Sequence, residues 1–321
     1  MEPLFKTLLA ASLIAAPLAG AQAAYPDKPI TMIVPLAPGG PSSILARLLT
    51  DELAKELKQT IIVDNRPGAS GSIGARRAAN AAPDGYTLIW GTTGTHAVNT
   101  LLHANLDYDP LKDFAPIALA ATAPNIVAVN PAFPAKTVAE LIQMAKTAPG
   151  KYDSAAAGVG TSVHMTGELF KQMAGIQINH VQYQGSAPAL TDVIAGHVPI
   201  VFDVNTTVMP HIRSGKLRGL GVSSKERLPN APELPTIAET IPGFESTLWY
   251  GVFAPAGTPD PVLQTLSTAV NAVLAKPEIK QRFIEYGAIA LGSTPAELHS
   301  HVATEIKKWD QLIKSVGIKV Q

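Results

Sequence analysis

The sequence contains no cysteine among its 321 residues. Without a thiol it offers no disulfide bond, no thiolate metal site, no cysteine nucleophile and no lipid-anchored cysteine. It also lacks net charge, because 25 basic residues balance 25 acidic ones. Domains that attract nucleic acid by bulk basicity are strongly basic, so we expect no nucleic-acid partner.

Long apolar segments are also missing. A short apolar run over 7–20 follows Lys6 and precedes the triplet AQA. This order is typical of a secretory signal peptide, and the run is shorter than the about 20 apolar residues that span a bilayer. We therefore expect a signal peptide over 1–23, cleaved after Ala23 or Ala24. The mature chain would then be exported and free of the membrane.

Strand and helix signals alternate along the rest of the chain. The apolar run from Ile30 to Val34 predicts a strand, and the period near 3.6 that follows predicts a helix capped by Ser42 or Ser43. The same succession returns later, and the part from Pro261 onward is mostly helical. Such a β-α-β order predicts two α/β halves with parallel, doubly wound sheets.

Two α/β halves and a helical tail allow two domain layouts. The halves could be sequential, or the tail could return to complete the first half. In the second layout the chain crosses twice between the halves, at the proline-rich stretches near 125 and 245. The pattern alone does not choose between the two.

Motifs typical of enzymes and metal sites are incomplete. Glycines 68, 71 and 74 have the spacing GxxGxxG, which differs from the GxGxxG of a dinucleotide site. The sequence has no Walker loop, no HExxH and no GxSxG. His164 and Glu168 could share a metal on one helix face, but no third ligand is near in sequence, which favours a solvated or capping pair. We predict no cofactor, no metal and no catalytic residue.

Four strand-to-helix junctions carry loops rich in glycine and hydroxyl side chains, at 38–43, 91–96, 158–162 and 185–187. In a doubly wound sheet these loops lie at the carboxyl ends of the strands, where ligands bind. Glycine lets the backbone approach a ligand, and free N–H groups at a helix start attract anions. The loops contain no Lys or Arg, so they predict an anion held by amides and hydroxyls. The alternative is that these turns only cap helices.

Ten stretches of the chain carry a more specific pattern. They are YPDKPITMIVPLAPGGPSSILARLL from Tyr25, VDNRPGASGSIGA, AAPDGYTL, YDPLKDFAPI, TVAELIQMAK, GELFKQMAG, VQYQGSAPALTDVIAGHV, HIRSGKLRGLGV, PTIAE and WYGVFAPAGTP. Together they resemble the Bug-type receptors of tripartite tricarboxylate transporters over essentially the whole mature chain. The resemblance implies an α/β, two-lobed periplasmic binding protein of the Venus-flytrap, type II-like kind. Each lobe would be a doubly wound sheet flanked by helices.

The resemblance also selects a layout and a function. It implies a first lobe over 24–125 plus 249–321, a second over 126–248, and crossings near 125 and 248. The protein would be a periplasmic receptor that binds a small organic carboxylate and delivers it to membrane permease subunits. The resemblance also implies that the protein is not an enzyme. We expect a monomer, because a receptor that closes around a solute needs no partner chain.

Site residues are carried over by position. The predicted ligand-binding residues are Gly39, Gly40, Ser42, Ser43, Thr93, Thr95, His96, Thr161, Ser162, His164, Tyr183, Gly185, Ser186, Asp203 and Trp249. The family often has a Thr-Asp pair where Ser42 and Ser43 stand, and a second-lobe loop rich in Ser and Asn. Here that loop has more apolar residues, among them Ala155, Ala156, Ala157, Val159 and Val163.

These departures bear on the ligand. A loop with fewer hydroxyl groups offers fewer hydrogen bonds to a ligand with several negative charges. Trp249 and Tyr250 could cover the apolar part of a ligand. We therefore expect a monocarboxylate or an aromatic carboxylate rather than citrate. The alternative is that Ala157 faces the core, and that Thr161, Ser162 and water keep the cleft polar.

Two other functions remain open from the sequence. The protein could report its ligand to a signalling partner. It could also be a secreted hydrolase that uses Ser162 and His164, although it lacks a nucleophile elbow and an obvious orienting acid.

Overall fold

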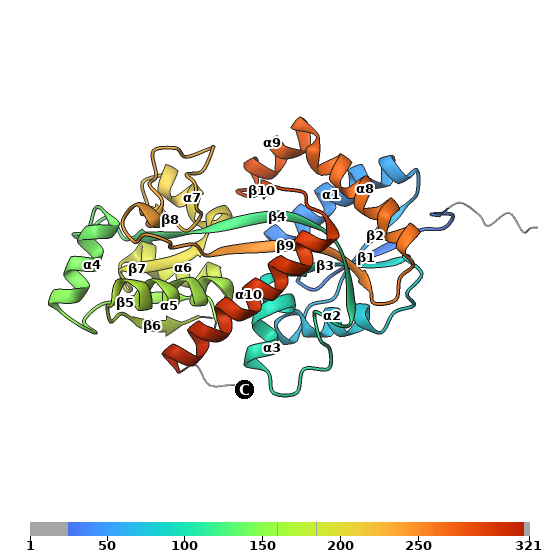
Figure 1. Ribbon diagram of the computed structural model, residues 1–321. Helices are drawn as coiled ribbons and strands as arrows, with labels where there is room; N and C mark the ends of the chain where they lie inside the picture. The colour runs from blue at the N-terminus through green and yellow to red at the C-terminus, as the bar shows by residue number, and fades with distance from the viewer. Residues whose placement is uncertain (1–24, 159, 184, 318–321) are drawn as a thin grey trace, which may run out of the picture.

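The computed structural model describes residues 25–158, 160–183 and 185–317. The predicted signal peptide over 1–23 lies outside them. Two lobes stand side by side, and two long strands run from one lobe into the other (Figure 1). Within the described residues, no helix combines the length and the apolar character that crossing a membrane requires.

The sheet of the first lobe has three parallel strands and then antiparallel ones. Its strands are β1 Ile30–Val34, β2 Ile61–Asn65, β3 Thr87–Thr92, β4 Phe114–Val129, β9 Thr247–Pro255 and β10 Ile289–Ala290. β1 pairs in parallel with β2 and β3. β9 lies antiparallel between β3 and β4, and β10 also pairs with β4.

The sheet of the second lobe continues from the last residues of β4. Its further strands are β5 Asp153–Ala156, β6 Asn179–Gln182, β7 Ile200–Val204 and β8 Arg218–Val222. β5 lies parallel to both β6 and β7. β7 and β8 pair antiparallel with β4, so β4 belongs to both sheets.

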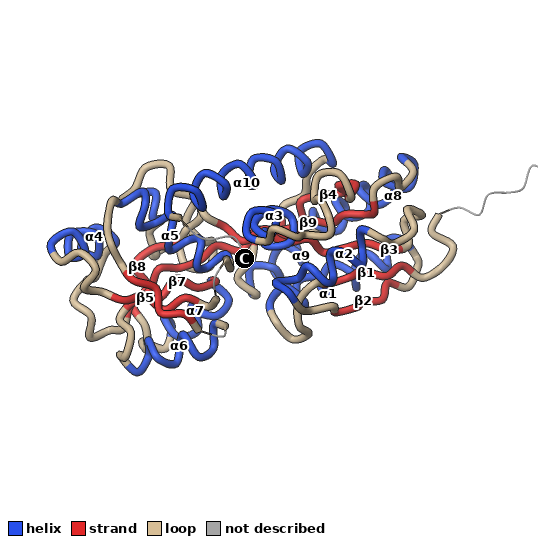
Figure 2. Tube along the Cα trace, turned by 90° about the horizontal axis from the view of Figure 1, so that it is seen from below, coloured by secondary structure: helices blue, strands red, loops and turns tan. Residues whose placement is uncertain are grey.

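Helices cover both faces of each sheet (Figure 2). In the first lobe they are α1 Pro41–Leu57, α2 Ser72–Ala79, α3 Asn99–Leu102, α8 Asp260–Ala275 and α9 Pro277–Glu285, with the short η1 Ala69–Gly71 and η2 Gly94–Val98. In the second lobe they are α4 Val138–Thr147, α5 Ser162–Ala174, α6 Ser186–Ala195 and α7 Asn205–Arg213, with η3 Ile237–Glu239. The last helix, α10 Pro295–Val316, runs along both lobes (Figure 1).

Alternate residues of a strand enter opposite apolar layers. Met32 belongs to the buried cluster that includes α1, α8 and α9, whereas Ile33 belongs to the cluster that includes α2 and α10. In the second lobe, Ile126 packs with α6 and α7, and Val127 packs with α4 and α5. Because both faces are buried, the central strands such as β1 and the second half of β4 are nearly continuous apolar runs, whereas the edge strands β2 and β6 are partly exposed and carry polar residues.

β4 and β9 carry the chain between the lobes. They pair with each other up to Pro124 and Thr247, and from Asn125 onward β4 pairs with β7. β4 therefore takes part in both sheets, whereas β9, among the described strands, pairs only within the sheet of the first lobe. We keep 24–125 plus 249–321 and 126–248 as the proposed domain limits.

A buried hydrogen-bond network surrounds this change of partner. The backbone N–H of Asn125 donates to Ser223 Oγ at 2.8 Å, and Asn125 Nδ2 donates to Thr166 Oγ1 at 2.7 Å. Thr166 Oγ1 lies 2.6 Å from Ser246 Oγ and donates to the carbonyl oxygen of Ser162 at 2.8 Å. The network thus links both crossing strands to the first turn of α5.

The structure confirms the two-lobed α/β fold and differs from the sequence analysis in detail. The sheets are mixed rather than parallel, because β4 and β9 run against their neighbours. The sequence does not predict β4, which contains Pro116 and Pro124; the pairing register shifts beside Pro116, which has no N–H to donate. α1 is capped by Gly40 and begins at Pro41, so neither Ser42 nor Ser43 is its cap.

Candidate functional site

The loop after β1 leaves the start of α1 open. Gly39 has a φ of +81°, which favours glycine, whereas Gly40 has an ordinary φ of −77°. A Cβ added at Gly40 would come no closer than 3.7 Å to another atom. No side chain caps α1. Ser42 Oγ is buried and makes no well-aligned hydrogen bond in the described part of the chain, but it lies next to the Tyr250 hydroxyl: burial raises the pKa of Tyr250, and Ser42 acts to lower it. Ser43 Oγ, in contrast, accepts from Asn65 Nδ2 at 3.1 Å.

The loop after β3 uses its predicted site residues internally. Thr95 Oγ1 accepts from the backbone N–H of Thr92 at 3.0 Å and lies 2.8 Å from His96 Nδ1. Burial lowers the pKa of His96 to about 3, so the ring is neutral near pH 7. Thr93 Oγ1 accepts from the backbone N–H of Trp249 at 2.9 Å. These side chains hold the loop in shape and join it to β9.

The two aromatic residues at the second crossing are inside the protein. Trp249 and Tyr250 are 0% and 1% exposed. Trp249 Nε1 donates to Glu305 Oε2 on α10 at 3.2 Å, and the Tyr250 ring stacks on Trp90 with 5.2 Å between centroids. This corrects the expectation that both rings cover a ligand, because packing against α10 and β3 leaves neither ring a free face.

The loop after β5 touches the first lobe. Gly158 and Gly160 have φ values of +107° and +75°. A Cβ added at Gly160 would lie 2.3 Å from Leu102 Cδ1 of α3, so a larger residue would have to displace that side chain in addition to adopting the positive φ. Thr161 caps α5, where its Oγ1 accepts from the backbone N–H of His164 at 3.4 Å and donates to the carbonyl oxygen of Gly158 at 2.8 Å.

The loop after β6 is organised by Asp203 at the end of β7. Ser186 Oγ and Thr207 Oγ1 each donate to Asp203 Oδ1 at 2.9 Å, while Oδ2 has no partner among the residues that the structure describes. Burial raises the pKa of Asp203 against the effect of these donors. Gly185, with a φ of +110°, precedes α6, and the Tyr183 hydroxyl donates to an aspartate of that helix.

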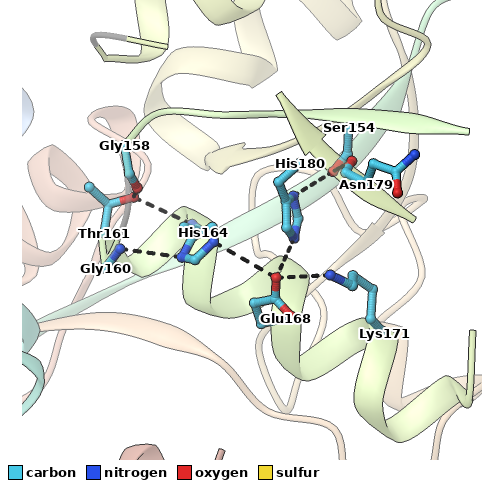
Figure 3. Close-up of polar contacts among 9 residues, drawn as sticks. All are labelled: Ser154, Gly158, Gly160, Thr161, His164, Glu168, Lys171, Asn179 and His180. Carbon is cyan, nitrogen blue, oxygen red and sulfur yellow. Dashed lines mark hydrogen bonds and ion pairs between the residues drawn. The ribbon is translucent and has the colours of Figure 1, made fainter. Parts of the chain in front are cut away.

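A charged cluster lies behind the 158–162 loop (Figure 3). Glu168 Oε1 is 2.8 Å from Lys171 Nζ, 3.1 Å from His180 Nε2 and 3.8 Å from His164 Nε2. Burial acts to raise the pKa of Glu168, but His180 and Lys171 lower it to about 2. Burial and the nearby His180 lower the pKa of His164 to about 4. From the sequence only the pair of His164 and Glu168 can be recognised, because His180 comes from β6 and reaches α5 only through the fold.

His164 is not paired with the serine that a hydrolase would need. Its Nδ1 accepts from the backbone N–H of Gly160 at 3.3 Å, and its Nε2 is directed at Glu168. Among the described hydrogen bonds, none joins His164 to Ser162. None of the described hydrogen bonds joins the loops at 38–43 and 91–96 to the loops at 158–162 and 185–187 either. The fold thus brings the predicted residues together within each lobe rather than across the two.

Known proteins are similar to this chain in architecture and in sequence. Residues 45–318 match the family described as the tripartite tricarboxylate transporter family receptor. BugT of Bordetella pertussis is 34% identical over 315 residues, which cover 98% of this chain and 96% of BugT.

Two solved structures with ligands are also similar. The R. palustris protein Rpa4515, solved with adipate, is 38% identical with a TM-score of 0.82, over 92% of this chain and 99% of that chain. MatC from Rhodopseudomonas palustris, solved with bound malate, is 34% identical with a TM-score of 0.76, over 90% of this chain and 100% of MatC. The chain therefore belongs to the tripartite tricarboxylate transporter receptor family, together with the Bug proteins.

Proposed function

We propose that the protein is a periplasmic receptor that captures a small organic carboxylate between its lobes and delivers it to the membrane subunits of a tripartite tricarboxylate-type transporter. Family membership and the adipate and malate complexes of its relatives support this role. The observation that carries it in this chain is the start of α1, whose first amides have no side-chain cap and lie beside the Ser42 hydroxyl.

A carboxylate at this position would be held by dipoles and hydroxyls. A helix start stabilises an anion by about 0.3–1 kcal/mol, or about 2 kcal/mol when partly buried. The second lobe would add the starts of α5 and α6, where Thr161 and Ser186 are oriented by Gly158 and Asp203. Asp203 is then a positioning residue, which holds the Ser186 hydroxyl at the first turn of α6.

The proposed ligand class includes dicarboxylates. Ala155, Ala156 and Val163 are 1%, 2% and 4% exposed, so their side chains belong to the interior of the second lobe. Since Trp249 and Tyr250 are also buried, the argument that aromatic rings cover the ligand loses its basis. Of the apolar loop residues that the structure describes, only Ala157 is half-buried, which leaves a weak argument for a less polar cleft. We therefore propose small organic carboxylates as a class, without that preference.

A thermal-shift screen of carboxylates tests the proposal. A ligand at 100 times its dissociation constant stabilises the folded state by about 2.7 kcal/mol, which raises the melting temperature. Gly40→Val should abolish this response, because the new side chain covers the start of α1 while the φ of −77° and the free space leave the fold intact. Ala132→Val, at an exposed turn of the second lobe, is the control and should respond as wild type. A Gly40→Val protein that binds normally would contradict the assignment.

Export and oligomeric state have their own test. We propose a mature chain that begins near Ala24 and is monomeric. Mass spectrometry of a periplasmic extract should show the shortened chain, and size-exclusion chromatography should give the mass of one chain. An intact chain from Met1 would contradict the predicted cleavage.

A further inference from the structure

Two histidines and a carboxylate meet in the charged cluster of α5. His180 Nε2 is buried 3.1 Å from Glu168 Oε1. At the other side of the ring, His180 Nδ1 lies 2.7 Å from Ser154 Oγ, which also lies 3.4 Å from the carbonyl oxygen of Asn179. Ser154 can therefore accept the ring proton of Nδ1, and in that tautomer Nε2 presents a lone pair to a metal ion.

The spacing of the cluster suits a metal ion. Ligand atoms of His164, Glu168 and His180 all lie within 4.8 Å of one another. Around a tetrahedral zinc ion, with bonds of about 2.0–2.2 Å, neighbouring ligand atoms are about 3.4 Å apart. The two distances to Glu168 Oε1, 3.1 Å and 3.8 Å, lie on either side of this value.

We propose that His164, Glu168 and His180 form a binding site for a divalent transition-metal ion that prefers imidazole and carboxylate ligands, such as Zn²⁺, with water as the fourth ligand. The Ser154 contact supplies the outer-shell hydrogen bond that fixes the tautomer of a histidine ligand. The third ligand, His180, comes from β6, whereas His164 and Glu168 both lie on α5. The pair on α5 alone supplies too few ligands for a metal site.

Two contacts have to give way when the ion binds. The Lys171 ammonium, 2.8 Å from Glu168 Oε1, neutralises the carboxylate in the metal-free protein. Its side chain is 21% exposed and can turn into solvent. His164 must move its proton from Nε2 to Nδ1, so the 3.3 Å hydrogen bond from the Gly160 backbone N–H is lost. Lys171 therefore competes with the ion for Glu168. Replacing Lys171 is an informative test for this reason.

The test uses the untagged protein without any carboxylate, so it does not depend on the proposed transport role. Zn²⁺ binding is measured by calorimetry, and Co²⁺ is added as a probe for its visible absorption in a histidine-containing site. We expect one ion per chain in the wild type and at least tenfold tighter binding in Lys171→Met. Ser154→Ala should weaken binding about 10–100-fold, as for other outer-shell partners.

His180→Gln and Glu168→Gln should each abolish the site, with circular dichroism showing that the variants are folded. His197→Gln, an exposed histidine of the same lobe, is the matched control and should bind as wild type. Zinc binding that survives in folded His180→Gln, or the absence of binding in both the wild type and Lys171→Met, would overturn the proposal. Because Lys171→Met changes a partly exposed side chain, its result stands even if a buried variant misfolds.

Discussion

The imidazole of His96 is stacked on the ring of Phe253, with 4.1 Å between the ring centroids and 18° between their planes. Gly91 makes this contact possible, because a Cβ there would lie 2.6 Å from the Phe253 ring and 2.7 Å from the His96 ring. The histidine of the β3 loop is thus part of the aromatic core of the first lobe, where only its neutral form is stable.

Acid should destabilise the protein through His96. Its pKa falls from an ordinary value of about 6.5 to about 3 in the folded state. Below about pH 6.5 the unfolded chain takes up a proton that the folded chain excludes, so stability is full above that pH and decreases toward pH 3. His96→Phe should reduce the loss of unfolding free energy between pH 7 and 4.5 by about 2 kcal/mol, measured by urea denaturation.

Part of the pH dependence should remain in that variant. His164 also has a lowered pKa, about 4, and acts in the same direction. An unchanged slope in His96→Phe would show that His96 titrates in the folded state as it does in the unfolded one.

Glu305 should be a large contributor to stability. Its Oε2 accepts from the indole nitrogens of Trp249 at 3.2 Å and Trp309 at 2.9 Å. Glu305→Leu leaves two buried N–H groups without an acceptor, each costing about 1–3 kcal/mol. Glu305→Gln keeps a carbonyl oxygen and should lose less. Equal melting temperatures for Leu and Gln at this position would contradict the assigned role.

Replacing Ser42 and Ser43 one at a time should separate an effect on ligand affinity from an effect on protein stability. Ser42→Ala removes the hydroxyl beside the first amides of α1 and should weaken carboxylate binding by about 1–3 kcal/mol. Ser43→Ala removes the contact with Asn65, so it should lower the melting temperature and leave affinity close to wild type. Calorimetric titration with a carboxylate identified in the screen measures both. If Ser43→Ala binds more weakly than Ser42→Ala, the assignment is reversed.

Thr166 should stabilise the crossing between the lobes. Thr166→Val has a similar shape but leaves Asn125 Nδ2 without its acceptor, at a cost of about 1–3 kcal/mol in unfolding free energy. Thr147→Val on α4 is the matched control, because Thr147 is exposed and donates only to Met144 of its own helix. That variant should stay within about 0.5 kcal/mol of wild type in chemical denaturation.

Local signals predicted the elements better than the site. β1 has the limits of its apolar run, Ile30–Val34, and α1 follows it as the period near 3.6 indicates, although Gly40 rather than a serine is its cap. β4 was missed because its strand character comes from partners far away in sequence, β7 to β10, whose pairing outweighs its prolines. The same limit applies to side chains: nothing in the sequence distinguishes Ser43, which contacts Asn65, from Ser42, which lies beside Tyr250.

α10 constrains how the two lobes can move apart. Its 22 residues make a rod about 33 Å long. It packs against β4 and η2 in the first lobe and against α5 in the second, where Gln172 Nε2 donates to Ser315 Oγ at 2.7 Å. An α-helix resists stretching, so this flank of the molecule keeps a constant length. We therefore expect a rotation between the lobes to pivot on this flank, so that a solute would enter from the side away from α10.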